Sequence, residues 1–497
     1  MTDNAAPLLL PECADVAVIG TGYSGVCIAI LMKLAGLHDF IMFEQADTVG
    51  GTWRDNHYPG AACDIASNLY SFSFEPNPHW TRVYPQQPEL QAYLLHCIEK
   101  YGLKPHLNCA AAVTEARFDE GSQRWNITVN GTLRLSARVL ISGTGGLSRP
   151  SVPALAGLAD FAGPAFHSAR WRHDVALQGK RVAVIGTGAS AIQFVPEIAP
   201  EAAHLTLFQR TPAWIIPKPD RALSAAERRR LTRHPRWQRL LRAADYTVRE
   251  SRALFFTRWP SVLKRLQLRI GRRMQHRIAD VALRAKLTPE YVLGCKRILL
   301  SNDFYAAVQR PNVSLVTAGI DRVAAGGIHT ADGVFHPADV LIFATGFQTG
   351  GAGTPFPMFG LAGIELNTVW AGGPQAYLGT TVTGYPNLFL MTGPNTGLGH
   401  NSMIYMIESQ TRYVIDALLT MRRQRLRAVE VLADAQRDYN ADLQARMRRT
   451  VWATGGCRSW YLAPDGSNPT LWPDFTFRFR HKTRRFDIER YRTWAAP

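Results

Sequence analysis

The sequence predicts an α/β fold with two Rossmann-like dinucleotide-binding domains, one inserted into the other, and a helical insertion. Two observations lead to this prediction. A unit of apolar strand, glycine-rich turn and apolar helix begins near residue 15 and recurs near residue 180, and each copy continues into a second apolar strand. With 497 residues, 46% hydrophobic and 19% charged, the chain has a globular composition and enough length for two to four domains.

The first unit begins with the strand VAVIG and continues into a glycine turn. There Gly20 permits the tight bend, Gly22 lets the backbone approach a pyrophosphate, and Gly25 allows close helix packing. Ser24 lies in the same turn, where the helix N–H groups and dipole attract an anion. The next strand, DFIMFE, ends at Glu44, 24 positions after Gly20. A carboxylate there accepts hydrogen bonds from a ribose diol, which favours the adenosine ribose of FAD.

The second unit repeats this pattern with one informative difference. After the strand KRVAVIG, the turn has Ala191 in place of the third glycine, and the strand HLTLF leads to Arg210. Arg210 lies 24 positions after Gly186, the offset at which the first unit has its carboxylate. A guanidinium there forms charge-assisted hydrogen bonds with a 2′-phosphate, so we expect NADPH to be preferred over NADH by at least about tenfold. The expected NADPH contacts are Gly186, Thr187, Gly188, Ala189, Ser190, Arg210 and Thr211.

The two units divide the chain into domains. Segments 140–153 and 340–347 each pair an apolar strand with a Thr-Gly turn, and they lie on either side of the second unit. They are therefore the expected crossovers between an FAD-binding domain and an NADPH-binding domain inserted into it. The predicted boundaries are 1–147 and 341–497 for the FAD-binding domain, 148–220 and 291–340 for the NADPH-binding domain, and 221–290 for a basic helical insertion.

Positive charge is concentrated in the helical insertion. The chain has 56 Lys and Arg against 39 Asp and Glu, a net charge of +17, and residues 221–290 hold 19 of these cations and 5 of the anions, or +14. Apolar residues recur at helical spacing between the arginines. Two interpretations remain open: a solvated basic face, or a surface for an acidic partner or an anionic membrane. Because the charge is so localised, we do not expect nucleic acid to be a partner.

Seven cysteines are dispersed along the chain, without a CxxC pair or the Cys/His spacing of a metal site. We therefore expect reduced thiols, no metal and no disulfide reductase activity. The N-terminus has no signal-peptide pattern, and the apolar runs stop short of the roughly 18 residues of a membrane span. These observations predict a cytoplasmic protein.

Two motifs narrow the chemistry. The pattern FxGxxxHxxxW is matched by Phe161, Gly163, His167 and Trp171. Residues 50–64 fit GGxWxxxx[FY]PGxxxD at every fixed position. Both motifs resemble the signatures of Baeyer–Villiger monooxygenases, which implies that FAD, NADPH and O2 convert a ketone into an ester or lactone through a C4a-peroxyflavin. Arg172 is closer to the nitrogen- and sulfur-oxidising flavin-containing monooxygenases, which remain the alternative.

The resemblance also implies roles for single residues. Asp64 would lie beside the flavin and orient Arg297, which would stabilise the peroxyanion and the tetrahedral intermediate; a purely structural salt bridge is the alternative. Lys296 matches a lysine that holds the 2′-phosphate, and His167 would couple movement of the NADPH domain to the flavin site. Trp460 would contact the nicotinamide, or else pack in the core. The remaining cofactor contacts implied are Gly51, Thr52, Trp53, Tyr70 and Met403.

Overall fold

The first sheet contains the N-terminal unit and receives strands from three parts of the chain. The computed structural model describes residues 10–349, 353–463 and 465–495. The strands are β1 Cys13–Ile19, β2 Phe40–Phe43, β3 Leu107–Asn108, β4 Val113–Asp119, β5 Arg124–Val129, β6 Leu133–Ser142, β17 Met358–Phe359 and β18 Leu388–Leu390. Their order is β17-β4-β5-β6-β1-β2-β3, and β18 pairs with the second half of β6. Parallel pairing joins β6, β1, β2 and β3, whereas β4, β5 and β6 pair antiparallel.

Helix α1 (Tyr23–Leu34) is apolar on almost every side because it is buried on almost every side. It contacts β1, α3 (Gln87–Lys100) and α12 (Met403–Arg423), and Val26 to Ile30 are all 0% exposed. The strands β1 and β2 are likewise buried runs of Val, Ile and Phe, as expected for parallel strands covered on both faces. The N-terminal unit is therefore the rigid centre of the first sheet.

The second sheet is entirely parallel and is built from residues 165 to 343. Its strands are β7 Ala165–His167, β8 Arg181–Ile185, β9 His204–Phe208, β12 Val313–Val316 and β16 Val340–Phe343. Their order is β12-β9-β8-β16-β7. The predicted boundary at residue 340 falls on the first residue of β16, and all four residues of that strand pair with β8. The second sheet thus continues three residues beyond the predicted boundary, and the chain next joins the first sheet at β17.

Smaller elements complete the second body. Helices α4 (Ala191–Ile198) and α10 (Phe304–Ala307) contact each other, and a separate antiparallel sheet is formed by β13 Ile320–Ala324, β14 Gly327–Thr330 and β15 Phe335–Pro337. Short 3₁₀ helices lie at Lys104–His106, Leu158–Asp160, Ser168–Arg170, Leu361–Gly363 and Ile488–Arg490.

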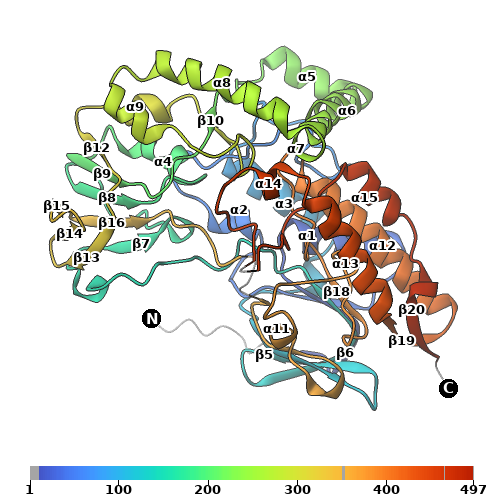
Figure 1. Ribbon diagram of the computed structural model, residues 1–497. Helices are drawn as coiled ribbons and strands as arrows, with labels where there is room; N and C mark the ends of the chain where they lie inside the picture. Colours follow the sequence, from blue (N-terminus) through green and yellow to red (C-terminus); the bar gives the residue numbers. More distant parts are fainter. Residues whose placement is uncertain (1–9, 350–352, 464, 496–497) are drawn as a thin grey trace.

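The helical insertion follows β10 (Ile215–Ile216) and is followed by β11 (Leu299–Leu300). These two strands pair in parallel and form a short ribbon at its base. Its helices are α5 Ala225–Arg233, α6 Pro235–Ser251, α7 Ala253–Thr257, α8 Pro260–Arg277 and α9 Val281–Leu287. They lie along one edge of the molecule, outside both sheets (Figure 1). The inner faces of α7, α8 and α9 are apolar and join the main core through residues such as Phe256, Met274 and Leu287. Helix α6 instead buries the polar side chains of Gln238, Arg249 and Glu250. The predicted amphipathic helices are therefore present.

The C-terminal part folds back over the first sheet (Figure 1). After α12 this part contains β19 Leu426–Val431, α13 Ala433–Met447, α14 Val451–Thr454, α15 Thr476–Lys482 and β20 Tyr491–Ala495. Two short helices lie earlier in the chain, α2 Thr52–Asp55 and α11 Leu366–Val369. β20 pairs antiparallel with β19. Over the described residues, no helix combines the length and apolar character that crossing a bilayer requires.

The expectation that all thiols are reduced is wrong for one pair. Cys295 and Cys457, 162 positions apart, form a disulfide. The loop before Cys295 also meets the segment after α14 through a hydrogen bond from the Val292 N–H to the Gly455 carbonyl at 3.0 Å. Sequence spacing could not reveal this pairing because only the tertiary fold brings the two segments together. The free cysteines are Cys13, Cys27, Cys63, Cys97 and Cys109.

Candidate active site

The first glycine turn is shaped so that a phosphate can approach its backbone. Gly20 has φ of +94°, and a Cβ there would lie 2.7 Å from the carbonyl oxygen of Gly143. A Cβ on Gly25 would lie 1.9 Å from the Gly20 carbonyl oxygen, so α1 packs directly against the turn. A Cβ on Gly22 would lie 3.7 Å from the Gly51 Cα, and α1 begins after Gly22 without a side-chain cap. The uncapped N–H groups therefore fit the pyrophosphate expected of FAD.

Glu44 lies directly after β2, and four donors already engage its carboxylate. Oε2 accepts hydrogen bonds from the Thr21 N–H at 3.2 Å and the Thr21 hydroxyl at 2.6 Å. Oε1 accepts one from the Ala46 N–H at 3.1 Å and is 2.8 Å from the Arg54 guanidinium. These four occupy the acceptor capacity of a carboxylate. A ribose diol must therefore replace one donor, and Arg54, on a long side chain, is the one able to withdraw.

Arg54 was not among the residues predicted from the sequence. The residue follows Trp53 in the longer motif, so the signal was present, but spacing alone gives no indication that its side chain turns back to the end of β2.

The longer motif lies beside the first glycine turn. Gly51 and Thr52 lead into α2, and Trp53 is buried with its indole N–H donating to the Tyr70 hydroxyl at 3.1 Å. Burial raises the pKa of Tyr70, so the phenol stays protonated. Ser24 is buried in the first turn of α1. The predicted contacts from the two N-terminal motifs therefore converge at one edge of the first sheet.

Met403 is the first residue of α12. Ser402 caps this helix by accepting a hydrogen bond from the Ile404 N–H at 3.3 Å, and its own hydroxyl is 3.4 Å from the Leu69 carbonyl. Since Leu69 precedes Tyr70, the start of α12 lies next to the segment that follows the longer motif.

The second glycine turn reproduces the first. Gly186 has φ of +110°, and a Cβ there would lie 2.5 Å from the Ala344 carbonyl oxygen. A Cβ on Gly188, in contrast, would meet nothing within 4 Å. Thr187 is buried, Ala189 is exposed, and Ser190 directly precedes α4. The backbone of the turn thus requires glycine at position 186. At position 188, glycine is required only so that a bound ligand can approach the backbone closely.

Two cations of this second site lie near enough for the charge of one to affect the other. Arg210 and Thr211 are exposed after β9. Burial, and then the nearby charge of Arg210, lower the pKa of Lys296. The Lys296 ammonium lies 5.1 Å from the centre of the Tyr291 ring. Two neighbouring cations that raise each other's energy fit a dianionic phosphate, which relieves their repulsion.

Asp64 and Arg297, 233 positions apart, form a bidentate ion pair. Arg297 Nε and Nη2 each donate to one carboxylate oxygen at 2.7 Å, and Nη1 donates to the Leu398 carbonyl at 3.4 Å. The Asp64 carboxylate raises the pKa of Arg297, so its guanidinium stays charged. The Arg297 side chain is 36% exposed and that of Asp64 30%, so part of the pair remains accessible to a ligand.

Two neighbours of this pair were not predicted. Tyr461 is buried, and burial raises the pKa of its phenol while the charge of Arg297 opposes the shift. Burial lowers the pKa of the Lys218 ammonium, which lies over the Tyr84 ring at 5.1 Å and near enough to Asp64 to feel its charge. Both lie far from Asp64 in sequence, and no motif marked them.

Trp460 is 53% exposed, so the interpretation of this side chain as a core aromatic is wrong. Its ring tilts against that of Tyr461, with centroids 4.6 Å apart. Trp460 is thus held beside the ion pair while most of its surface stays available to a ligand.

The shorter motif lies at the edge of the second sheet. His167 is buried, its Nδ1 accepts a hydrogen bond from the Ala169 N–H at 3.1 Å, and burial lowers its pKa. The imidazole meets the Phe347 ring, which follows β16, edge-on at 5.7 Å. Trp171 packs between two phenylalanines. Arg172 is exposed and forms an ion pair with Asp174, so it is a surface residue.

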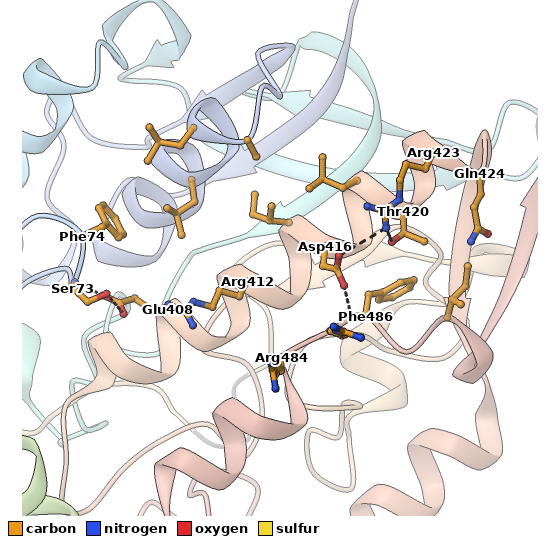
Figure 2. Close-up of a pocket in the computed structure, with 17 residues that line it drawn as sticks. Ser73, Phe74, Glu408, Arg412, Asp416, Thr420, Arg423, Gln424, Arg484 and Phe486 are labelled. Atoms are coloured by element: carbon orange, nitrogen blue, oxygen red, sulfur yellow. Dashed lines mark hydrogen bonds and ion pairs between the residues drawn. The ribbon is translucent and has the colours of Figure 1, made fainter.

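A cavity of about 900 Å³ lies elsewhere, between α1, α12 and residues 484–488 (Figure 2). Within it Asp416 accepts a hydrogen bond from the Phe486 N–H at 2.8 Å. Its described lining contains none of the predicted site residues. The described His, Cys, Asp and Glu residues include no cluster suited to a metal ion.

Comparison with known proteins agrees with this geometry. Residues 13–359 match the model of a family described as flavin-binding monooxygenase-like. A Baeyer–Villiger monooxygenase of Pseudomonas aeruginosa is 50% identical over 501 residues, covering 100% of this chain and 94% of the relative. One of Streptomyces coelicolor is 47% identical, covering 97% and 92%. The solved structure of cyclohexanone monooxygenase from Rhodococcus sp. Phi1 bound to NADP+ superposes with a TM-score of 0.88 at 28% identity, covering 98% and 100%.

Proposed function

We propose that this chain, which belongs to the flavin-binding monooxygenase-like family and is an FAD- and NADPH-dependent Baeyer–Villiger monooxygenase, uses Arg297 and Asp64 as its catalytic pair. It inserts one oxygen atom of O2 next to a ketone carbonyl and forms an ester or lactone. The observation that carries the proposal is the bidentate contact between the two side chains, both of which remain partly exposed.

The pair suits a reaction in which negative charge develops on oxygen. When bound, NADPH supplies the reducing equivalents and reduced FAD activates dioxygen. Arg297 remains charged throughout and donates in a planar fork, so it stabilises the carbonyl oxygen of the ketone as that oxygen becomes anionic. Asp64 fixes the plane of the fork through two hydrogen bonds and so acts as a positioning residue.

Other residues hold the cofactors in this proposal. Gly20, Gly22, Gly25 and the start of α1 receive the FAD pyrophosphate, and Glu44 receives the ribose once Arg54 withdraws. Arg210 and Lys296 hold the 2′-phosphate of NADPH. The exposed ring of Trp460 contacts the nicotinamide beside Arg297. His167, between the second sheet and residue 347, couples the two domains.

The test of the catalytic pair is Arg297→Ala, assayed on linear, cyclic and aryl ketones under ¹⁸O2. The wild-type protein should place one labelled oxygen in the ester. The variant should lose ester formation by about 10²–10³-fold, the usual effect of removing an oxyanion donor, while NADPH still reduces the flavin. The reducing equivalents should then appear as hydrogen peroxide.

Arg181→Ala is the matched control, because Arg181 forms an exposed ion pair with Asp339 in the second sheet. This variant should keep ester formation. Asp64→Asn, which keeps one acceptor for the guanidinium, should retain more activity than Asp64→Ala. Ester formation at the wild-type rate in Arg297→Ala would contradict the proposal. A loss of FAD binding and thermal stability in step with activity would favour a purely structural salt bridge.

We also propose that the two sheets form the FAD- and NADPH-binding domains. The inserted position of the second sheet, between β6 and β17, supports this division. A cytoplasmic location is proposed on the five free cysteines, and the Cys295–Cys457 disulfide is the one feature that is unusual for that compartment. Cell fractionation that recovers the enzyme outside the cytoplasm would contradict it.

Finally, we propose that the basic helices bind an anionic partner. The exposed arginines of α5, α6 and α8 support this interpretation over a purely solvated face. The nature of that partner follows from the apolar residues that accompany the charges.

A further inference from the structure

We infer that the outer face of α8 docks on an anionic lipid surface, separately from catalysis. The helix has 18 residues, no Asp or Glu, and six Lys or Arg. All six cations are exposed, and the described part of the chain places no acidic side chain in ion-pair contact with any of them. They are Lys264, Arg265, Arg269, Arg272, Arg273 and Arg277.

Large apolar side chains lie on the same exposed face. Trp259, which precedes the helix, is 52% exposed, Leu266 43% and Leu268 65%, and Val262 is exposed as well. Trp259, Val262 and Leu266 are three and four residues apart, so they form one stripe on the helix. Cations surround this stripe. Such a face, basic with an aromatic and aliphatic side chains, is the composition of helices that lie in the headgroup region of an anionic bilayer.

The helix is held rigidly enough to present this face. Its inner side buries Leu263, Met274 and the following Ile278 in the main core. Gln267 accepts a hydrogen bond from the Leu293 N–H at 3.1 Å, which ties the helix to the loop that leads to Arg297. α8 runs along the outer edge of the molecule, away from both sheets (Figure 1). The face is therefore presented outward in a fixed orientation, and docking leaves the ion pair and the glycine turns untouched.

A lipid surface fits these observations better than an acidic protein. An acidic protein would need carboxylates at positions that match these cations. It would also need an apolar patch to cover the exposed apolar stripe. Mobile anionic headgroups adapt to any spacing of arginines, and the acyl boundary below them accepts the apolar side chains.

Vesicle sedimentation of the full-length enzyme with FAD bound tests the inference. Vesicles of phosphatidylcholine alone are compared with vesicles in which part of it is replaced by phosphatidylglycerol. We expect binding only to the anionic vesicles, and less of it as salt screens the charges. The triple variant Arg265→Gln, Arg269→Gln, Arg273→Gln should lower the partition coefficient by about 100-fold.

The matched control removes three exposed arginines elsewhere: Arg427→Gln, Arg448→Gln, Arg449→Gln. It should bind vesicles almost as well as wild type. A second variant, Leu266→Ser with Leu268→Ser, keeps every charge and should lower vesicle binding by about tenfold. It should leave binding to immobilised polyglutamate unchanged, because that polymer offers no apolar layer.

Several outcomes would overturn the inference. They are equal sedimentation with neutral and anionic vesicles, equal losses in the triple variant and its control, and capture by polyglutamate without vesicle binding, which would indicate an acidic protein partner. Ester formation measured without vesicles should be the same in wild type and all these variants. A failure of docking is therefore distinguishable from a failure of the proposed catalytic pair.

Discussion

Single residues explain why this site suits a charged cofactor and a developing oxyanion. The Arg297 guanidinium is oriented by two hydrogen bonds that it donates to one carboxylate, and the Arg297 side chain is still partly exposed. Lys296, the adjacent residue, lies near the cation Arg210 instead of an anion, and the charge of Arg210 disfavours the charged form of Lys296. The two adjacent residues therefore differ in how their charges are balanced. The charge of Arg297 is balanced by Asp64 within the protein, whereas that of Lys296 would be balanced by the phosphate of the bound nucleotide.

Arg210→Ala tests the origin of cofactor preference. Removing a charge-assisted hydrogen bond to the 2′-phosphate removes about 1.5–3 kcal/mol from NADPH binding. We expect kcat/KM for NADPH to fall by about tenfold or more, with kcat/KM for NADH nearly unchanged. Steady-state kinetics with both nucleotides measure this, and an equal loss for both would show that Arg210 does not read the phosphate.

The pH dependence of NADPH binding tests Lys296. Burial and Arg210 lower its pKa, and a lysine is charged only below its pKa. Attraction for the 2′-phosphate is therefore complete at low pH and is lost as the pH rises through a value below that of an ordinary lysine. KM for NADPH should rise with pH on the alkaline side. In Lys296→Gln the KM should be higher and flat with pH; a rise that persists in this variant would assign it to another group.

At this scale, sequence could indicate residue types and not their partners. Glu44 and Arg210 follow from one shared offset, and the Asp64–Arg297 pair follows from family motifs. The contacts of Arg54 with Glu44, and of Tyr461 with Arg297, depend on side chains that meet only after the chain has folded. The exposure of Trp460 likewise depends on what packs around it.

At the scale of elements, the two glycine turns are built alike. In each, the first glycine approaches the carbonyl of a crossover strand end, Gly143 for one turn and Ala344 for the other. The crossovers were predictable because a buried strand followed by Thr-Gly occurs on each side of the second unit. The sheet that β16 joins was not predictable, because a strand of four apolar residues does not indicate which of two sheets it pairs with.

The second turn allows the roles of its two glycines to be separated. Gly186→Ala would place a Cβ 2.5 Å from a carbonyl oxygen at φ of +110°, and should lower the free energy of unfolding by about 2 kcal/mol or more. Gly188→Ala meets nothing in the protein and should leave the melting temperature unchanged, yet raise KM for NADPH because the methyl group occupies the path of the pyrophosphate. Thermal melts with nucleotide kinetics distinguish the two, and equal effects would contradict the assignment.

At the scale of the whole molecule, one covalent bond joins the catalytic loop to the C-terminal part. Replacing Cys295 and Cys457 by serine should lower the free energy of unfolding by about 2–5 kcal/mol, since the disulfide closes a long loop. The melting temperature of wild type should fall in dithiothreitol, whereas that of the double variant should not respond. Cys13→Ser, which removes an exposed free thiol, is the control. A double variant as stable as wild type would contradict this expectation.

The overall charge distribution was readable from sequence, because +14 of +17 falls in one segment. The outward face of α8 was not readable from sequence, since large apolar residues occur on both of its sides and the packing of Leu263 and Met274 selects the inner one.

The short ribbon of β10 and β11 has a consequence for how such enzymes diversify. It pairs Ile215 with Leu299 and Ile216 with Leu300, so the segment between them starts and finishes at neighbouring points. Its length can then change at little entropic expense, since each doubling of a loop adds only about 0.6 kcal/mol. Homologues can therefore differ in this peripheral segment, and so in their location in the cell, while the two sheets and the site between their motifs stay unchanged.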